Sequence, residues 1–232
     1  MTERIFANRP DGPVALPELV RAFARDVDSL EAVWLNDLGG LTFRDGERYL
    51  KWNPLGPVDL DDERARLAWA ASRHPVPEIL EFGCDDHGQV LVTRALNGRS
   101  AVADEWRARP RDAVRAIAEG LRTLHELPTD DCPFVCRWAQ TEGVAPNDLV
   151  VVHGDPCAPN TIIGEDARFA GHVDLGSLGV SDRWSDLAVA SMSLGWNFGP
   201  GWEAEAEFFA AYGIVPDADR IRRYRALWGA AP

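Results

Sequence analysis

Lysine is almost absent from this chain of 232 residues, in which only one of the 24 basic residues is a lysine and the others are arginines. That lysine, Lys51, lies in the alternating stretch Arg48-Tyr49-Leu50-Lys51-Trp52, which predicts a β-strand. Arginine meets the need for positive charge elsewhere, so the exception suggests a task that suits a compact ammonium on a flexible stem. A surface lysine at the end of a strand is the alternative reading.

Long apolar runs are absent too, and none approaches the roughly 20 residues that a membrane-spanning helix needs. The first four residues are not followed by the apolar core of a signal peptide. Four scattered cysteines form no CxxC pair. We therefore expect a cytoplasmic protein without a membrane partner and with reduced thiols, although Cys132 and Cys136 could form a bridge or bind a metal.

Basic residues are few relative to acidic ones, with 24 against 37, so the net charge is −13 and the pI is near 4.8. A protein that binds the phosphates of a nucleic acid needs a basic surface, so this excess of acidic residues argues against a nucleic-acid partner. The charge would favour a cationic substrate, although acidity also aids solubility. The length allows one large core or two lobes, and we expect a monomer or a weak dimer.

The motif with the most chemical content is HGDPCAPN at residues 153–160, followed by GHVDLG at 171–176. Asp155 can accept the hydrogen bond of an attacking hydroxyl, while Asn160 and Asp174 supply the oxygen ligands that Mg²⁺ prefers. Apolar runs at 148–152, 161–163 and 168–173 predict short strands around the loop. This arrangement is typical of protein-kinase-like phosphoryl transfer, although each piece alone could be an ordinary loop or strand end.

The first part of the sequence predicts a β-rich lobe with one helix. Asp45-Gly46 is a hairpin signal, and Glu63 lies in a predicted helix over 62–71, where it is the natural partner of Lys51. Gly39 and Gly40 would let backbone N–H groups approach a phosphate, or simply make a tight turn. The predicted helix and strands of this part cover residues 16–23, 31–36, 41–44, 47–52, 78–82 and 89–93.

The chain turns helical after a predicted hinge at residues 94–98, whose backbone could pair with adenine, and we count Thr93 and Ala95 among the nucleotide-binding residues. Apolar spacing predicts helices over 111–126, 184–194, 202–212 and 219–227. His125, at the end of the first of these, is interpreted as a hydrogen bonder rather than a ligand. The four tryptophans of this last third, which we expect in the core rather than as stacking platforms, are Trp184, Trp196, Trp202 and Trp228.

The sequence resembles the aminoglycoside 3′-phosphotransferases, within the protein-kinase-like small-molecule kinases, from about Val33 to Leu227. The segments that carry the resemblance are 50–51, 63–69, 75–77, 124–125, 132–134, 148–160, 179–188, 212–214, 216–217 and 220–221. It implies an α+β, two-lobed fold with a β-rich nucleotide-binding lobe over residues 1–95. A mainly helical lobe for catalysis and substrate would cover residues 96–232.

Carried over residue by residue, the resemblance implies a complete phosphate-transfer site. Lys51 and Glu63 would form the phosphate-binding ion pair, Asp155 would be the catalytic aspartate, and Asn160 and Asp174 would hold magnesium. His153 would brace the loop. Structural support by a salt bridge and a helix cap would come from Asp182, Arg183 and Asp186.

The departures from the family lie in the part that recognises the drug. The family carries a helical insertion with acidic residues before the catalytic loop, whereas only residues 135–149 remain here. The family usually ends in acidic residues plus aromatics, whereas this chain ends Ala226-Leu227-Trp228-Gly229-Ala230-Ala231-Pro232, with no carboxylate side chain. The resemblance therefore implies a shortened member whose drug-recognition half is eroded.

The sequence thus predicts an ATP- and Mg²⁺-dependent O-phosphotransferase for a small hydroxylated molecule, with antibiotic resistance as a role that the family suggests. GTP in place of ATP stays open. The alternatives are a kinase of a sugar or another metabolite, a nucleotide-binding pseudokinase with a regulatory role, and a binding protein without nucleotide. A chain freed from catalysis has no chemical need for Lys51, Glu63, Asp155, Asn160 and Asp174 together, which argues against the pseudokinase. A binding protein without nucleotide would require the spacing of these residues to be a coincidence.

Overall fold

The computed structural model describes residues 10, 12–36, 38–139, 148–199 and 203–230. The chain divides into two compact units, of which the first comprises residues 1–68 and 77–95. The second comprises residues 69–76 and 96–232. The short segment 69–76 thus belongs with the second unit, although it precedes the predicted break near residue 95.

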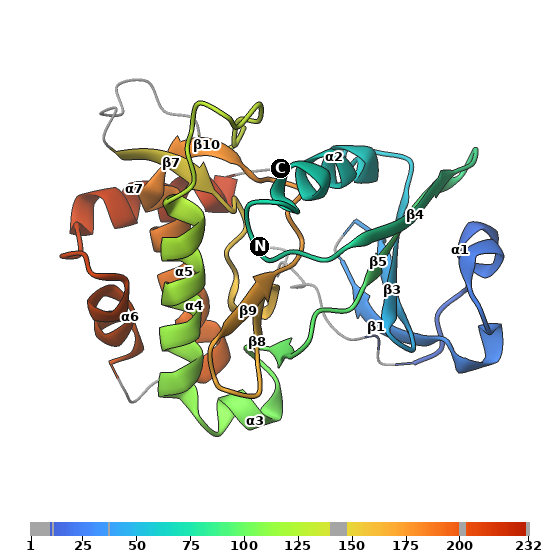
Figure 1. Cartoon of the computed structure of the whole chain (residues 1–232), viewed down its shortest axis with the longest axis horizontal. Helices are drawn as coiled ribbons and strands as arrows, with labels where there is room; N and C mark the ends of the chain where they lie inside the picture. The colour runs from blue at the N-terminus through green and yellow to red at the C-terminus, as the bar shows by residue number, and fades with distance from the viewer. Residues whose placement is uncertain (1–9, 11, 37, 140–147, 200–202, 231–232) are drawn as a thin grey trace. The chain divides into compact units, whose positions relative to one another are not determined.

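The first unit is built on one antiparallel sheet of five strands, in the order β1-β2-β3-β5-β4 (Figure 1). Its strands are β1 (Glu31–Leu35), β2 (Leu41–Asp45), β3 (Arg48–Pro54), β4 (Ile79–Cys84) and β5 (Gly88–Arg94). Buried apolar residues on one face, including Leu50, Val90 and Val92, pack with Val20 of helix α1 (Glu18–Phe23). The alternation along β3 that buries Leu50 places Lys51 on the opposite face.

The hairpin between β2 and β3 turns one residue later than the sequence predicts. Asp45 pairs with Arg48 within the ladder, so that the turn residues are Gly46, at a φ of 63°, and Glu47. The buried carboxylate of Asp45 accepts hydrogen bonds from the Arg48 guanidinium and from the backbone N–H of Arg25. These contacts hold Asp45 in the strand, and no local turn signal reveals them.

Helix α2 (Leu60–Ala70) buries one face, with Leu60, Glu63, Leu67 and Ala70 all less than about a tenth exposed. These residues recur at helical spacing, so the glutamate shares the apolar side of the helix. A carboxylate in such a place is costly without a partner. The helix therefore needs a cation against Glu63.

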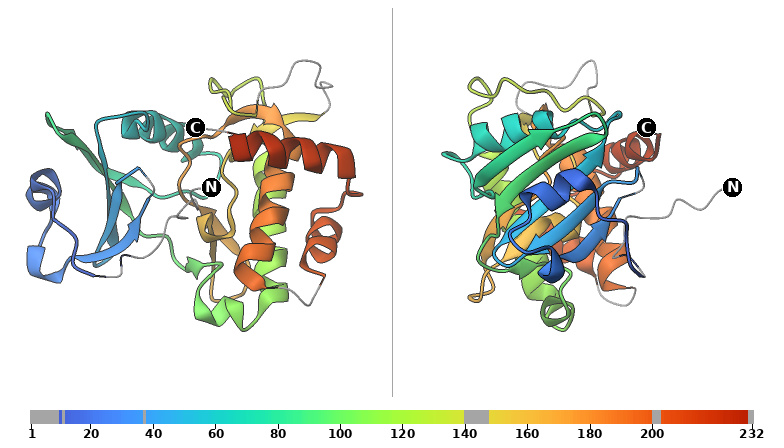
Figure 2. Two further views of the ribbon diagram at one scale, coloured as in Figure 1. Left: turned by 180° about the vertical axis from the view of Figure 1, so that it is seen from behind. Right: turned by 90° about the vertical axis from the view of Figure 1, so that its right-hand side faces the viewer.

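The second unit is mainly helical and is centred on α5 (Arg183–Phe198), which packs against α4 (Pro110–His125), α6 (Ala204–Tyr212) and α7 (Ala218–Ala230) (Figure 2). Its core contains Trp106, Ile117, Leu121, Leu187 and Phe208. The helix predicted from residue 202 begins at Ala204, and Trp202 lies outside the described residues. Short helix α3 (Asp104–Arg107) was not expected from the sequence.

Two small sheets lie in this unit. Strand β7 (Leu149–Val152) pairs with β10 (Gly179–Asp182), whereas β8 (Thr161–Ile163) pairs with β9 (Phe169–His172) and with β6 (Arg99–Ser100). The sequence predicts β7, β8 and β9 but not the short β6 and β10. Since β7 leads into residues 153–160 and β9 leads into Asp174, these pairings fix the two ends of the candidate site.

Candidate functional site

The predicted ion pair of the first unit is formed in the structure. Lys51 Nζ lies 2.8 Å from Glu63 Oε2, with side-chain exposures of 21% and 6%. Lys51 sits in the middle of β3, opposite Thr42 of β2 and Leu91 of β5, rather than at a strand end. The lysine thus neutralises the carboxylate that α2 turns inward, and its side chain stays partly exposed.

The loop after β7 is held by one carboxylate from α5. Asp186, fully buried, accepts hydrogen bonds from the backbone N–H groups of His153, at 2.6 Å, and Gly154, at 3.0 Å. Gly154 has a φ of 80°, and a Cβ there would lie 2.3 Å from the carbonyl oxygen of Ser177. Only glycine meets both conditions without strain.

His153 joins the catalytic loop to the strand that carries Asp174. Its Nδ1 accepts the backbone N–H of Asp155 at 3.2 Å, and its Nε2 lies 3.1 Å from the carbonyl oxygen of Val173. The first partner can only donate and the second can only accept, so in these two contacts Nδ1 accepts and Nε2 donates.

Asn160 closes the same group. The side-chain Nδ2 of Asn160 donates to the backbone oxygen of Asp155 at 2.9 Å. The backbone oxygen of Asn160 accepts the N–H of Val173 at 3.0 Å. Asp174 follows directly, with a φ of 62° that few residues other than glycine adopt. The structure therefore brings Asp155, Asn160 and Asp174 together through a continuous set of hydrogen bonds.

The electrostatics of this group favour a cation. Burial, and next the negative charge of Asp174, raise the pKa of Asp155. Oδ1 of Asp155 is buried and has no hydrogen-bond partner among the described residues. Two carboxylates that oppose each other's ionisation, beside an amide oxygen, form a donor set that suits a hard divalent ion. The described residues contain no group of three or more histidine, cysteine, aspartate or glutamate side chains placed to hold a metal.

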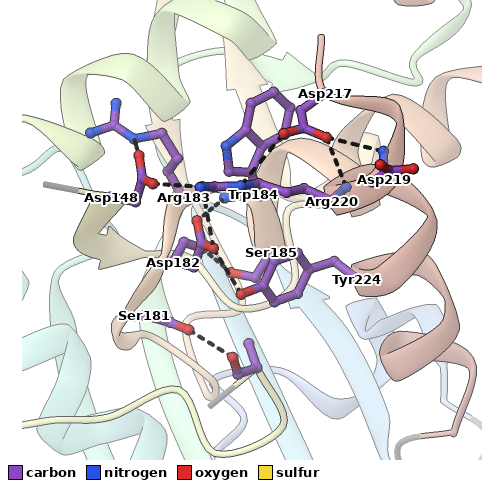
Figure 3. A network of polar contacts seen from close by, with 11 residues as sticks. Asp148, Ser181, Asp182, Arg183, Trp184, Ser185, Asp217, Asp219, Arg220 and Tyr224 are labelled. Atoms are coloured by element: carbon purple, nitrogen blue, oxygen red, sulfur yellow. Dashed lines mark hydrogen bonds and ion pairs between the residues drawn. The ribbon is translucent and has the colours of Figure 1, made fainter. Parts of the chain in front are cut away.

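The predicted support residues lie in a network of polar contacts at the start of α5, in which Asp182 is buried and Arg183 and Arg220 are partly exposed (Figure 3). Asp182 caps the helix by accepting the N–H of Trp184 at 3.0 Å, and it accepts the Tyr224 hydroxyl of α7 at 2.9 Å. Arg220 lies 2.6 Å from Asp148 and 3.7 Å from Asp182, and Arg183 lies 3.8 Å from Asp148. This network secures the helix whose next turn carries Asp186.

The predicted nucleotide-binding backbone groups have partners within the first unit. Gly40 N donates to Asn36 Oδ1 at 2.6 Å, and Gly39 N donates to Asn36 O at 3.2 Å. A Cβ on Gly40 would clash with the side chains of Asn36 and Asn53. Thr93 lies in β5 opposite Tyr49, and the N–H of Ala95 donates to Glu47 O at 2.8 Å. These contacts explain both glycines as turn residues. That Gly39, Gly40, Thr93 and Ala95 contact a nucleotide stays a prediction.

The sequence reasoning missed two groups next to the loop. Trp138 donates its indole N–H to the carbonyl oxygen of Gly154 at 2.7 Å. His172 Nδ1 lies 3.0 Å from His74 Nε2, and its ring is 5.0 Å from that of His153. His74 and His172 are separated by 98 positions, so sequence spacing gives no signal for their contact. His125, expected as a hydrogen bonder at the end of α4, does bond to Tyr212 and Asp186.

The sequence matches the model of the phosphotransferase enzyme family over residues 20–139 and 135–226. The chain belongs to this family. Streptomycin 3″-kinase of Streptomyces griseus is 33% identical over 258 residues, which cover 85% of this chain and 92% of the relative. An aminoglycoside 3′-phosphotransferase of Streptomyces fradiae is 35% identical over 231 residues, which cover 78% of this chain and 84% of the relative.

Solved structures of this family are similar along most of the chain. Aminoglycoside phosphotransferase APH(3″)-Id from Streptomyces rimosus has a TM-score of 0.73 and 31% identity, covering 90% of this chain and 94% of that one. The same enzyme in complex with ADP and streptomycin has a TM-score of 0.71 and 30% identity. The predictions of a protein-kinase-like α+β fold and of an aminoglycoside-phosphotransferase-like enzyme are thereby confirmed.

The family members are longer than this chain, as the sequence predicts. The alignment with the Streptomyces griseus kinase spans 258 residues, more than the 232 of the chain, so that relative contains residues without a counterpart here. Residues 140–147, within the segment where we expect the lost insertion, lie outside the described residues. In the part of the chain that the structure describes, no helix is both long and apolar enough to cross a membrane.

Proposed function

We propose that this protein is an ATP- and Mg²⁺-dependent O-phosphotransferase that transfers the γ-phosphoryl group to a hydroxyl of a small molecule. The observation that carries the proposal is the hydrogen-bonded group of Asp155, Asn160 and Asp174, with His153 between its two strands. Such a group combines a base for the hydroxyl with ligands for a cation.

Asp155 is the group that receives the acceptor hydroxyl. Its carboxylate orients the oxygen for attack and takes the proton as the new P–O bond forms, while the bond between the γ-phosphorus and the β–γ bridging oxygen breaks and ADP leaves. Asn160 fixes the backbone of Asp155 through Nδ2, so the amide oxygen is the part of its side chain available to a cation. Asn160 and Asp174 would hold Mg²⁺, which neutralises the charge of the triphosphate when bound.

Lys51 binds the α- and β-phosphates in this proposal, and Glu63 holds it in place. The Lys51 side chain is 21% exposed, and its ammonium is paired with Glu63 at 2.8 Å, so the ion pair orients a lysine that is not fully buried. The nucleotide is ATP in this proposal, and GTP stays open as an alternative. An enzyme with these requirements is expected in the cytoplasm, where ATP and Mg²⁺ are supplied, as a monomer or a weak dimer.

The class of acceptor is proposed from the family, and its size and charge are proposed from the short segment at residues 135–149. The relatives are named for streptomycin and for the 3′ position of aminoglycosides. We propose an acceptor that is smaller or less cationic than kanamycin-type drugs, because only residues 135–149 stand where the family's acidic insertion is expected. A role in antibiotic resistance holds if that acceptor is a drug.

A kinase of a sugar or another metabolite is the second candidate. A similar structure from the choline/ethanolamine kinase family is 22% identical, which supports the fold and no substrate. The pseudokinase alternative predicts nucleotide binding without turnover.

An acceptor screen by mass spectrometry separates these possibilities. The protein is incubated with ATP and Mg²⁺ and with streptomycin, neomycin, kanamycin, simple sugars and amino alcohols, and each product is examined for the added phosphoryl mass. We expect one class of acceptor to gain the phosphoryl mass. The Asp155→Ala variant is the matched control, and it should transfer far less phosphate to the same acceptor. Nucleotide binding with no ATP turnover under any condition would identify a pseudokinase. If Mg-ATP did not shift the melting temperature, both the kinase and the pseudokinase would be excluded.

A further inference from the structure

The peptide between Gly154 and Asp155 is held at both of its polar groups. Its carbonyl oxygen accepts the Trp138 indole N–H at 2.7 Å, and its N–H donates to His153 Nδ1 at 3.2 Å. The preceding peptide donates the Gly154 N–H to Asp186. Trp138 is thus the side chain that determines where the Gly154 carbonyl points.

Trp138 is placed there by β10. The segment before it forms a parallel bridge between Val135 and Val180, with Cys136 N donating to Val180 O and Val180 N donating to Phe134 O. A Cβ on Gly179 would lie 2.4 Å from the carbonyl carbon of Val135, so glycine permits this close approach. Backbone contacts therefore fix the position from which the indole reaches the loop.

Trp228 of α7 supports the indole from another side. The two rings lie 5.1 Å apart at an interplanar angle of 72°, which is a favourable edge-to-face arrangement. Both tryptophans are partly buried. The C-terminal helix thus contacts the catalytic loop through one aromatic side chain.

We infer that Trp138 is a positioning residue for Asp155, acting through the carbonyl group of Gly154. The inference rests on the proposed function, in which Asp155 meets the acceptor hydroxyl. Gly154 has no Cβ and lies at a φ of 80°, so its own backbone does little to prevent rotation of the following peptide. Pro156 restricts Asp155 on the other side. The indole N–H supplies the restraint that glycine cannot, and it keeps the carboxylate aimed.

The test is Trp138→Phe, which keeps an aromatic ring and removes the N–H. Trp69→Phe is the matched control, because Trp69 Nε1 also donates to a backbone oxygen, that of Asp131 at 2.8 Å, and its ring also meets another aromatic edge, that of Phe134. We expect Trp138→Phe to lower kcat about tenfold, the scale of one buried hydrogen bond. The KM for ATP should stay within about twofold, since the nucleotide-binding groups are untouched. The control should change neither.

A double-mutant cycle distinguishes positioning from a general structural effect. If Trp138 acts through Asp155, adding Trp138→Phe to Asp155→Ala should change the remaining turnover by less than about twofold. The inference is overturned if Trp138→Phe matches the control, or if it lowers turnover by the same factor in both backgrounds. Should Trp138→Phe fail to fold, Trp228→Leu must lower kcat about threefold, the scale of one aromatic pair. An unchanged kcat in that variant also overturns it.

The contact itself is testable without activity. In a ¹H–¹⁵N spectrum, the indole N–H assigned by its loss in Trp138→Phe should exchange with solvent at least about 100-fold more slowly than in a free tryptophan. Exchange at the free rate would refute the positioning contact. Absence of phosphoryl transfer by the wild-type protein, with the indole still protected, would instead refute the proposed function.

Discussion

Asp155 carries a carboxylate in an environment that opposes its charge. Burial raises its pKa, and the neighbouring charge of Asp174 raises it further. A base with a raised pKa takes up the proton of a hydroxyl more readily than an ordinary carboxylate. A bound cation beside Asp174 would offset the repulsion, so the residue is suited to act when metal and nucleotide are both present.

Replacement of Asp155 tests this directly. We expect Asp155→Ala to lower kcat by roughly two to four orders of magnitude, the scale of a positioned acid–base group. The affinity for ATP should change little, because in the proposed mechanism the Asp155 carboxylate meets the acceptor rather than the nucleotide. Steady-state kinetics and nucleotide titration measure the two quantities. Turnover within about threefold of the wild-type value would contradict the assignment.

Asp174 and Asp186 lie on the two sides of the loop, and their amide variants should differ in kind. Asp174→Asn removes a negative charge from the proposed metal site, so we expect weaker Mg-nucleotide binding and slower turnover. Asp186→Asn removes one of the two oxygens that receive the N–H groups of His153 and Gly154, and we expect a loss of about 2–3 kcal/mol in unfolding free energy. Urea unfolding and nucleotide titration of both variants provide the comparison. A folded Asp186→Asn protein without activity, beside an active Asp174→Asn protein, would reverse the two roles.

At the scale of elements, β9 and the segment after α2 are joined by buried histidines. His74 Nε2 lies 3.0 Å from His172 Nδ1, and the N–H of His172 donates to the oxygen of Pro75. Burial lowers the pKa of His74 to about 3 and that of His172 well below its usual value. Both imidazoles are therefore neutral in the folded protein near neutral pH.

This pair should make the fold sensitive to mild acid. Below about pH 6.5 the unfolded chain protonates His74, whereas the folded chain does so only near pH 3, so stability falls as the pH falls through this window. One such histidine corresponds to about 2 kcal/mol of unfolding free energy between pH 7 and pH 5. Between pH 7 and pH 5, the unfolding free energy of His74→Phe should fall by about 2 kcal/mol less than that of the wild-type protein. Urea unfolding at the two pH values measures it, and an equal pH dependence of the two proteins would contradict the assigned pKa shift.

The elements predicted from the sequence are those with strong local patterns. The strand of Lys51, the helix of Glu63 and the helix of His125 have clear periodicity, and each forms within a few residues of its predicted bounds. Strand β10 has only four residues, and its pairing with β7 depends on tertiary contact. The HGD motif likewise indicates Asp155 from the sequence. The hydrogen bond from Trp138 to the Gly154 carbonyl depends on the bridge between Val135 and Val180, so no local sequence pattern predicts it.

At the scale of the whole molecule, the charge of −13 attracts cations without orienting them. Such long-range attraction is screened within about 10 Å at ordinary salt. Binding of a polycationic drug needs several carboxylates at close range, because a single exposed pair contributes only about 0–1 kcal/mol. The short segment at residues 135–149, where the family's acidic insertion is expected, leads us to expect fewer such carboxylates here.

We therefore expect weak or absent phosphorylation of kanamycin-type drugs, with a KM well above the micromolar range. Steady-state assays with kanamycin and neomycin, beside streptomycin and uncharged alcohols, measure the preference. A kcat/KM above about 10⁵ M⁻¹s⁻¹ for kanamycin or neomycin, within the range of efficient enzymes, would contradict the prediction. It would show that other acidic residues, such as Glu203 and Glu205, converge on the drug.

The lone lysine has a practical consequence for proteolysis. An endoprotease that cuts only after lysine has a single target in this sequence, the bond between Lys51 and Trp52. That bond lies within β3, which is paired on both sides by β2 and β5, so cleavage requires the sheet to open. One cut, giving two fragments, would then report the opening of this unit alone. Any ligand that binds the folded unit would slow the appearance of the fragments by an amount that reveals its affinity.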